Sequence, residues 1–349
     1  MAFIKASNRR RAQCGGALKS FLSFIAVLAL LSVLALAAGG YFGYRMAHAP
    51  GPFENDKIVL LQSGSSVSSI ADVLKSAGVI EHAELFIAAV RLRREQGSLK
   101  AGEYEIPASS SVMEIIDQLI EGKTILHYFT AAEGLTTAQI LRGLNANEIL
   151  TGDITIEPGE GELLPETYAF HRGDTRDGII RRMMNAQDQL IEAQWEARAT
   201  ELPFATPDEA IILASIVEKE TAVPEERDRV AAVFVNRLRR GMRLESDPTI
   251  IYGLTQGEPL GRGLRVSELR GETPYNTYVI SGLPPTPIAN PGEASILAVL
   301  NPADTEDLFF VADGNGGHAF ATNLRDHNRN VAAWRRIERE QRAAEQENG

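Results

Sequence analysis

Glu218 is the residue whose type and setting best suit acid–base chemistry. It follows the almost wholly apolar run AIILASIV (210–217) and precedes Lys219 and Glu220. Burial disfavours the charged form of a carboxyl, and so does the negative end of a helix dipole. A carboxyl that keeps its proton near neutral pH is what protonation of a glycosidic oxygen requires. The alternative interpretation is a structural glutamate that pairs with a Lys or Arg at a helix end.

The helix that would carry this carboxyl has a clear start and end in the sequence. Thr206 fits the N-cap, Pro207 the first helical position and Glu209 the partner of a capping box. The helix must end before Pro224, because the residue before a proline disfavours helical geometry. Its apolar residues point in nearly every direction, which predicts a buried helix. Mostly small side chains share the face of Glu218: Ile211, Ala214, Ser215 and Ala222.

Three loop-like segments supply the groups expected of a carbohydrate site. They are SDPT (246–249) with Tyr252, TPYNTY (273–278) and GLPPTPIANPG (282–292). Sugars stack on aromatic rings and form hydrogen bonds with amides and hydroxyls. The prolines stiffen these loops and so reduce the entropy cost of binding. For any one segment, the alternative is a structural proline turn with buried tyrosines.

Other chemistries lack support in the sequence. The only cysteine is Cys14, so the chain after it has neither a disulfide framework nor a cysteine metal site. His318 and His327 do not have a usual metal-ligand spacing. The sequence has no GxSxG elbow and no phosphate-binding glycine loop. We therefore expect no metal and no cofactor.

The distribution of charge argues against nucleic acid as a partner. Residues 1–45 hold six of the 35 Lys and Arg residues and no acidic residue. The remaining chain therefore has 29 basic and 46 acidic residues. Phosphates would be repelled by a surface of this sign, whereas a neutral or cationic ligand would not.

An uncharged stretch of 24 residues, 21–44, predicts a transmembrane helix. Such a helix is about 36 Å long, enough to cross a hydrocarbon core of roughly 30 Å. The basic residues of segment 1–20 predict a cytoplasmic tail, which places the rest of the chain outside the cytoplasm. A cleaved signal peptide is the alternative, but the apolar stretch exceeds the usual 7–15 residues of one. A retained anchor is the better interpretation.

The rest of the chain predicts an α+β fold with two modules. After a linker at 45–56, a strand (57–62), two helices (65–77 and 82–94) and a returning strand (102–106) make a module of LysM-like size. Glycines and prolines are too frequent at 157–165 and 282–292 for a helical bundle, so the second domain should be mixed α/β with long ordered loops. The predicted parts are a LysM-like module at 57–130, a catalytic domain at 131–338 and a charged tail at 339–349, with a C-terminal helix over 330–348.

Several phrases in one order resemble the YceG-like family of endolytic murein transglycosylases. They are EGELLPETYAF (160–170), ASIVEKET (214–221), VFVNRLRRGMRLESDPTIIYG (233–253), TPYNTY, GLPPTPIANPG and GHAFATNLRDHN (317–328). The resemblance covers roughly residues 20–335. Two positions depart from the family pattern: Glu245 replaces a common Gln, and Thr286 replaces a frequent Gly.

The resemblance implies cleavage of the β-1,4 bond between N-acetylmuramic acid and N-acetylglucosamine in nascent glycan strands. Such enzymes leave 1,6-anhydro ends, act beside peptidoglycan synthases at the periplasmic face of the inner membrane, and are expected to terminate strand elongation. The first Glu of EKET, here Glu218, would be the catalytic acid and then the base. The expected substrate-binding residues are Asn236, Ser246, Asp247, Tyr252, Tyr275, Asn276, Tyr278 and Asn290, with Glu166 and Glu220 as further helpers.

Two other functions remain open on the sequence alone. A true muramidase would use water and a second carboxylate, such as Asp247 or Glu245. A non-catalytic scaffold would bind the cell wall through its LysM-like module.

Overall fold

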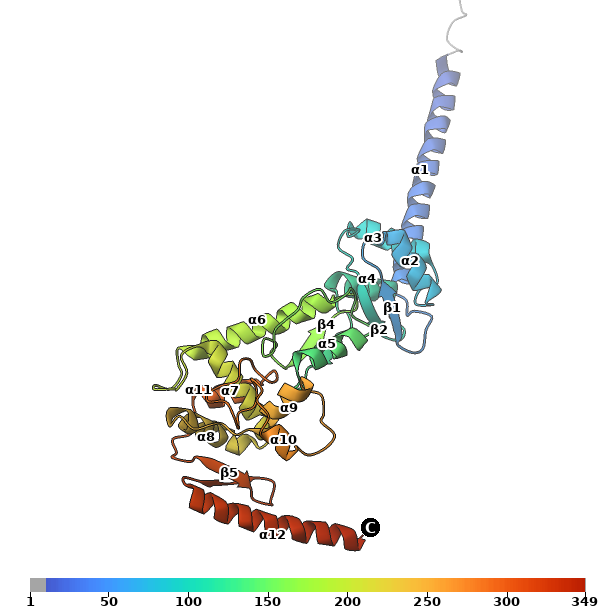
Figure 1. Ribbon diagram of the computed structural model, residues 1–349. Helices are drawn as coiled ribbons and strands as arrows, with labels where there is room; N and C mark the ends of the chain where they lie inside the picture. The colour runs from blue at the N-terminus through green and yellow to red at the C-terminus, as the bar shows by residue number, and fades with distance from the viewer. Residues whose placement is uncertain (1–10, 349) are drawn as a thin grey trace, which may run out of the picture. The chain divides into compact units, whose positions relative to one another are not determined.

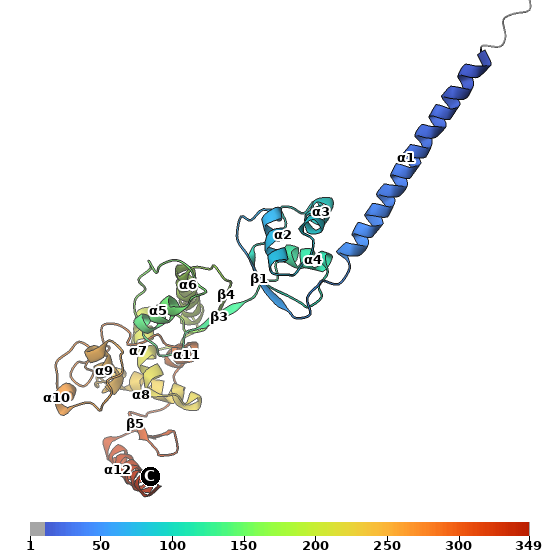
Figure 2. The ribbon, with the colours of Figure 1, turned by 90° about the vertical axis from the view of Figure 1, so that its right-hand side faces the viewer.

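The structure is a computed structural model that describes the backbone of residues 11–348 and the side chains of residues 20–343. Lys5, Arg9 and Arg10 of the predicted basic tail lie outside the described residues. The chain divides into two compact units, one up to Ile125 and one from Leu126 onward. Figure 1 and Figure 2 show the helices and strands of each unit.

Helix α1 (Arg11–Ala47) contains the predicted membrane segment. Within it, Ser20–Ala47 is long and apolar enough to cross a membrane, and its large apolar side chains are exposed. The helix is therefore compatible with a single-pass anchor. It continues three residues beyond the predicted end at residue 44, since no proline or glycine intervenes before Pro50.

The segment expected to be a linker, 45–56, packs onto the first unit. Phe53 is 4% exposed and belongs to the apolar core of this unit. Its carbonyl accepts the Ser109 backbone N–H at 2.9 Å, and Gly51 N–H donates to the Ser109 carbonyl at 3.0 Å. These contacts hold the segment in place, so it is not a free linker.

The strand, two helices and strand predicted for the first unit are present. β1 (Lys57–Leu61) pairs antiparallel with β2 (Gly102–Ile106), with Lys57 opposite Ile106. Between them lie α2 (Val67–Ser76) and α3 (Ala83–Arg93), and α4 (Val112–Glu121) follows. Apolar side chains from all these elements form one core, because each helix is amphipathic.

The second unit is mainly helical, with two short antiparallel strand pairs. Its first part contains β3 (His127–Thr130), α5 (Thr137–Ala146), β4 (Thr167–Phe170) and α6 (Arg176–Trp195). Because β3 pairs with β4, the unit begins at Leu126 and not at the predicted residue 131. A core of apolar side chains from α5, α6 and the strand pair supports this part.

The remaining elements of the second unit surround the central helix α7 (Pro207–Glu220). In chain order they are the 3-10 turn Pro224–Glu226, α8 (Arg227–Arg239), α9 (Asp247–Thr255), α10 (Val266–Leu269), α11 (Glu293–Leu300), β5 (Phe309–Ala312), β6 (His318–Ala321) and α12 (Leu324–Asn348). Helix α12 lies along the β5–β6 pair and starts six residues before the predicted start at 330. The fold is thus mixed α and β, as predicted.

Long segments without helix or strand connect these elements, as the glycine and proline content predicted. Residues 157–165 and 282–292 contain neither helix nor strand. They are nevertheless ordered by specific hydrogen bonds, which matters for the site described next.

Candidate functional site

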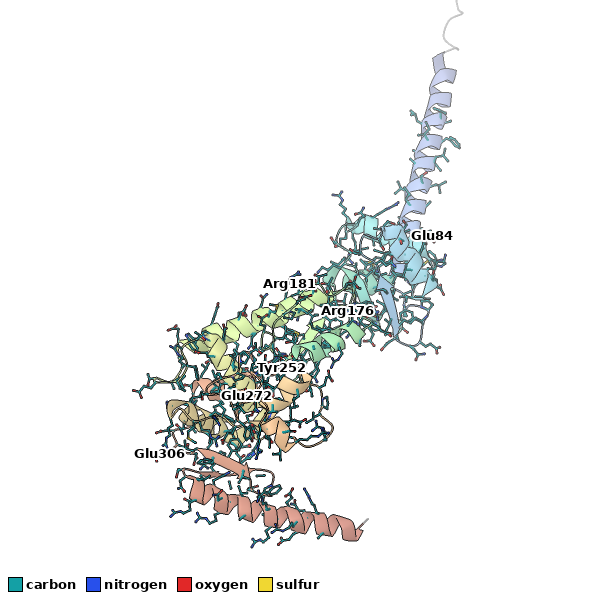
Figure 3. The ribbon with its side chains drawn as sticks, in the orientation of Figure 1. Glu84, Arg176, Arg181, Tyr252, Glu272 and Glu306 are labelled. Carbon is teal, nitrogen blue, oxygen red and sulfur yellow. The ribbon has the colours of Figure 1, made fainter. Side chains whose placement is uncertain are left out.

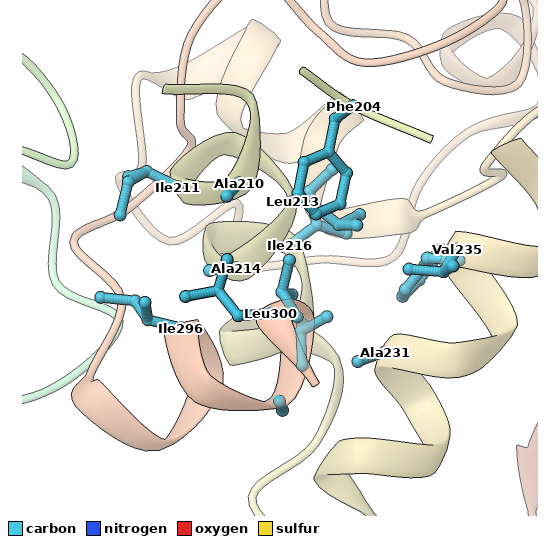
Figure 4. Packing of buried hydrophobic residues seen from close by; sticks show 14 of the residues in the cluster. Phe204, Ala210, Ile211, Leu213, Ala214, Ile216, Ala231, Val235, Ile296 and Leu300 are labelled. Carbon is cyan, nitrogen blue, oxygen red and sulfur yellow. The ribbon is translucent and has the colours of Figure 1, made fainter. Parts of the chain in front are cut away.

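Helix α7 forms the centre of the second unit. Thr206 is its N-cap, and the capping box with Glu209 is present, as predicted from the sequence. Every residue from Ala210 to Val217 is buried, because α7 packs between α8 and α11. In Figure 4, Ala214 and Ile216 of α7 lie next to Ile296 and Leu300 of α11. Such packing fixes the position of the last turn of α7, which carries Glu218.

The helix ends earlier than its sequence allows. Its last residue is Glu220, and Thr221 has extended backbone angles. Pro224 only sets an outer limit further along the chain, and after the helix the Thr221 hydroxyl accepts the Val223 backbone N–H at 3.0 Å. Ala222, predicted to share a helical face with Glu218, therefore lies outside the helix and is exposed. That part of the prediction is wrong.

Glu218 is half-buried and held by the start of α11. Its Oε2 accepts the backbone N–H of Gly292 at 3.0 Å and the hydroxyl of Ser295 at 2.7 Å. Oε1 has no hydrogen-bond partner among the described residues, and no ion pair there involves Glu218. Because Oε2 already accepts two hydrogen bonds, a proton on this carboxyl belongs on Oε1, the oxygen that is free to meet a ligand.

A second carboxyl, Glu133, lies beside Glu218 and was not predicted. It belongs to the turn between β3 and α5, where Gly134 N–H donates to the Asn290 carbonyl at 3.0 Å. A Cβ added to Gly134 would lie 3.5 Å from Glu218 Cγ. Partial burial and the charge of Glu218 raise the pKa of Glu133. The only sequence signal was an acidic residue in a Glu-Gly turn before a well-capped helix.

The predicted helper Glu220 faces a different group of residues. Its carboxylate accepts the hydroxyl of Ser246 at 2.5 Å. Burial raises the pKa of Glu220 to about 6, opposed by the Ser246 hydrogen bond, and the charge of Asp247 raises it further. Ser246 is buried, and its backbone N–H also donates to Thr277 Oγ1 at 2.9 Å. The half-buried Glu220 and the buried Ser246 therefore form a pair that connects the end of α7 to the start of α9.

Two of the predicted tyrosines approach each other, and the third binds an exposed carboxylate. The rings of Tyr252 and Tyr275 meet edge to face with 5.0 Å between centroids. Tyr252 lies inside the unit (Figure 3) and is 7% exposed, whereas Tyr275 is half-buried. Tyr278 donates its hydroxyl to Asp247 Oδ1 at 2.8 Å. The exposed Asp247 and the half-buried Tyr275 and Tyr278 are the members of this set that keep surface available for a ligand.

Asn290 is fully buried and connects the loops around the site. Its Oδ1 accepts the backbone N–H groups of Gly161 at 3.1 Å and Leu163 at 3.0 Å. Its Nδ2 donates to the Leu135 carbonyl, Thr137 Oγ1 and Glu160 Oε1, each at 3.1 Å. All its hydrogen-bonding capacity is thus used within the protein. Asn290 therefore holds the loop that leads to Gly292, two residues later, and its role in substrate binding stays a prediction.

Glu160 is the half-buried carboxyl at the centre of this loop network. It accepts the Thr137 backbone N–H at 2.7 Å and the Tyr252 hydroxyl at 3.2 Å. Burial raises the pKa of Glu160, and the Thr137 hydrogen bonds oppose this effect. The charge is therefore stabilised by donors from α5 and α9, which connects the two parts of the unit.

The other two predicted asparagines also have protein partners. Asn236 Nδ2 donates to the Thr305 carbonyl at 2.8 Å and the Asp307 carbonyl at 3.1 Å. Asn276, fully buried, donates to three carbonyls at the end of α10 and accepts the Tyr278 N–H at 3.0 Å. None of these contacts involves Glu218. Sequence alone does not distinguish an asparagine that binds a ligand from one that holds a loop.

Known proteins share the motifs of this chain. The profile of the YceG-like family matches residues 59–333. The chain belongs to the YceG-like family. Two relatives are named endolytic murein transglycosylase. The protein of Streptococcus pneumoniae serotype 2 (strain D39) is 31% identical to this chain over 85% of its length. The protein of Bacillus subtilis (strain 168) is 30% identical to it over 84% of its length. The alignments span 62% of the Streptococcus protein and 90% of the Bacillus protein.

A solved YceG-like structure is also similar to this chain. The crystal structure of a YceG-like protein from Listeria monocytogenes matches with a TM-score of 0.48 at 29% identity. The match covers 79% of this chain and 99% of that one.

Glu245 and Thr286, the two positions that the sequence resemblance singled out, have defined partners. Glu245 has a left-handed backbone conformation, with a φ of 54°, and accepts a hydrogen bond from Arg237 at 3.0 Å. Thr286 shares a hydrogen bond of 2.8 Å with the Tyr275 hydroxyl. The Thr286 hydroxyl therefore orients the ring of Tyr275, which a glycine at this position would not do.

Histidines and acidic residues do not gather into a metal site within the described residues. His318 Nδ1 and Glu226 Oε2 are 2.7 Å apart, and His327 stacks on Phe309 with 5.0 Å between ring centroids. These two histidines support the β5–β6 pair and its contact with α12.

Proposed function

We propose that the chain is an endolytic lytic transglycosylase of peptidoglycan, with Glu218 as general acid and then general base. The observation that carries this proposal is the arrangement of the Glu218 carboxyl. Gly292 and Ser295 hold Oε2, while Oε1 has no partner among the described residues. The names of the curated relatives, endolytic murein transglycosylase, support the same reaction.

The reaction needs one acid that changes role. Glu218 donates its proton to the glycosidic oxygen, and the bond from C1 of N-acetylmuramic acid to that oxygen breaks with its electron pair on the oxygen. The C6 hydroxyl of the same sugar then bonds to C1, and its proton passes to Glu218. No water is consumed, and a 1,6-anhydro end is the product. The hydrogen bonds at Oε2 keep the carboxyl in one position through both steps.

Substrate contacts are proposed for side chains that keep exposed surface. Tyr275 and Tyr278 offer ring faces, and Asp247 offers an exposed carboxylate that accepts the Tyr278 hydroxyl through one of its oxygens. The strand-binding role of the first unit, as a LysM-like module of residues 57–130, belongs to the same proposal.

The proposed location follows from α1. A single-pass helix with basic residues before it would keep the N-terminus in the cytoplasm and place both units in the periplasm, at the inner membrane. Nascent strands emerge there from peptidoglycan synthases, which are the proposed partners, and cleavage would end strand elongation.

The muramidase alternative requires a free second carboxylate. Of the two candidates from the sequence, Glu245 pairs with Arg237, whereas the exposed Asp247 accepts the Tyr278 hydroxyl through one oxygen only, so the products of the reaction decide between the two mechanisms. Digestion of purified glycan strands by the full chain in detergent, followed by mass spectrometry, distinguishes the two reactions. We expect 1,6-anhydro ends. Reducing ends would replace this proposal with hydrolysis, and intact strands would favour the scaffold.

A further inference from the structure

Helix α3 of the first unit carries a leucine that is almost fully exposed. Leu92 is 87% exposed, which exceeds the exposure of every large apolar side chain in the membrane segment of α1. Other residues, Ala83, Phe86 and Val90, form the buried side of α3, so Leu92 lies on the outer side of this helix. A single exposed leucine is common on protein surfaces, so the surroundings of Leu92 decide what it can bind.

Two unpaired arginines flank Leu92. Arg91 and Arg94 are exposed, and neither forms an ion pair with a residue that the structure describes. Arg93, by contrast, pairs with Asp117 of α4 at 2.5 Å. Arg94 ends α3 with a left-handed φ of 60°, at a position where glycine is more usual. The end of α3 therefore presents one apolar side chain between two positive charges.

The start of α3 lies beside the end of the membrane helix. Met46 of α1 lines the same pocket as His82 and Leu85 at the start of α3. Ala47, the last residue of α1, is only 5% exposed, so α1 joins the first unit without a free linker. Figure 1 and Figure 2 both show α3 next to this end of α1. Since α3 is about 16 Å long, all of it lies within one helix length of the point where α1 would leave a membrane.

Building on the proposed location of α1 in a membrane, we propose that the end of α3 docks on anionic phospholipids of the bilayer that α1 crosses. Arg91 and Arg94 bind phosphate groups of the lipid headgroups, and Leu92 enters the boundary between headgroups and acyl chains. Segments that lie on membranes combine basic and apolar side chains in this way. Anionic lipid attracts each cation that comes within a Debye length of the surface.

The acidic residues of α3 lie at its other end. Glu81 and Glu84 are exposed, and the Glu81 carboxylate is 3.9 Å from the ring nitrogen of His82. The helix dipole favours acidic residues at the start of a helix and basic residues at its end. The charge of α3 thus changes sign along its length, and only the end that carries Leu92 attracts anionic lipid.

A glycan strand fits the end of α3 less well than a lipid surface. Residues 91–97 include no aromatic ring on which a sugar could stack. A neutral glycan also gains little from two unpaired arginines, whereas a phosphate forms charge-assisted hydrogen bonds with them. Docking on lipid would hold the first unit at the membrane surface, where nascent strands emerge under the proposed function.

The test measures contact between the end of α3 and lipid in the full chain. In a Cys14→Ser background, which has no other cysteine, Gln96→Cys carries an environment-sensitive fluorophore four residues after Leu92. In the control, Glu105→Cys carries the fluorophore on β2, which Figure 1 draws at the end of the first unit away from α3. Both residues are exposed.

The labelled proteins are reconstituted into vesicles of phosphatidylcholine, alone or with about one third phosphatidylglycerol, that contain a lipid-bound quencher. We expect quenching of the label at residue 96 in the anionic vesicles and none at residue 105. Replacing both Arg91 and Arg94 by Gln should lower the ratio of docked to undocked label about thirtyfold, which corresponds to about 1 kcal/mol for each cation. Leu92→Ser should lower it as well, whereas Lys123→Gln, which removes an exposed cation elsewhere in the unit, should not.

The proposal would be overturned by equal quenching at the two positions, or by quenching that persists without both arginines. Quenching that appears only after glycan strands are added would overturn it as well. Protein that does not float with the vesicles in a density gradient would contradict the membrane location of α1, and the docking with it. Reducing ends from digested glycan strands would instead contradict the proposed reaction and leave the result of the quenching test in force.

The folded state is monitored separately by thermal unfolding. Since Arg91, Leu92 and Arg94 are exposed, their substitution should leave the melting temperature unchanged. A loss of quenching with an unchanged melting temperature therefore reports the loss of lipid contact.

Discussion

Ser295→Ala tests how far the position of Glu218 depends on α11. Ser295 is fully buried, and its hydroxyl donates to Glu218 Oε2 at 2.7 Å. The substitution removes this donor and leaves the Gly292 N–H at 3.0 Å as the one remaining. The carboxyl can then rotate about a single hydrogen bond, so the orientation of Oε1 is no longer fixed.

The size of this effect follows from the hydrogen bond that is lost. A hydrogen bond to a charged group contributes about 1.5–3 kcal/mol. Each ~1.4 kcal/mol of lost transition-state stabilisation lowers the rate about tenfold. We therefore expect kcat to fall about tenfold to a hundredfold. KM should change little, because the Ser295 side chain is buried and has no surface for a ligand.

The assay is the initial rate of 1,6-anhydro product at several concentrations of glycan strand. Thr206→Ala is the matched control, because Thr206 caps the other end of α7 and accepts the Glu209 N–H at 3.2 Å. Loss of this cap should lower the free energy of unfolding by about 1 kcal/mol and leave kcat unchanged below the melting temperature. If Ser295→Ala kept kcat within about twofold of the native value, the argument from hydrogen-bonded positioning would be refuted.

Two further predictions concern the groups that support the site. Asn290→Ala leaves the buried N–H groups of Gly161 and Leu163 without their acceptor. Thermal or urea unfolding should therefore show that the free energy of unfolding falls by about 3 kcal/mol or more. A fall of less than about 1 kcal/mol would contradict the stabilising role of this hydrogen-bond network. Glu220→Gln tests the pH dependence of stability. The pKa of Glu220 is about 6 in the folded protein and 4.5 in the unfolded chain, so its protonated form stabilises the fold below pH 4.5. This contribution to the free energy of unfolding, about 2 kcal/mol, is lost as the pH rises through about 6. The variant should lack this part of the fall in unfolding free energy, and an identical pH dependence in both proteins would sink the assignment.

Local signals in the sequence predicted the elements that carry the site. The capping box at Thr206, the apolar run before Glu218 and the proline at 224 define α7, because each acts within one or two helical turns. The glycines and prolines of 282–292 likewise predicted a loop without helix or strand. These features depend on neighbouring residues alone.

Contacts between distant segments were beyond the reach of such signals. Gly292 and Ser295 lie 74 and 77 residues after Glu218, and nothing in the local sequence indicates that they would bind its carboxylate. A Cβ on Gly292 would lie 2.0 Å from Glu133 Oε1, a contact between distant loops that the local sequence does not indicate. For the same reason the sequence could not indicate that the amides of Asn276 and Asn290 hold loops together.

The most direct test of the proposed chemistry is the activity of Glu218→Gln. The amide oxygen of Gln can still accept the hydrogen bonds of Gly292 and Ser295, so the fold and the melting temperature should match those of the native protein. The amide cannot donate or take up the proton of the reaction. We expect the variant to release no 1,6-anhydro products from glycan strands under conditions in which the native chain does. Undiminished release by a folded Glu218→Gln protein would show that another residue is the acid, or that the glycosidic bond is broken by a different chemistry.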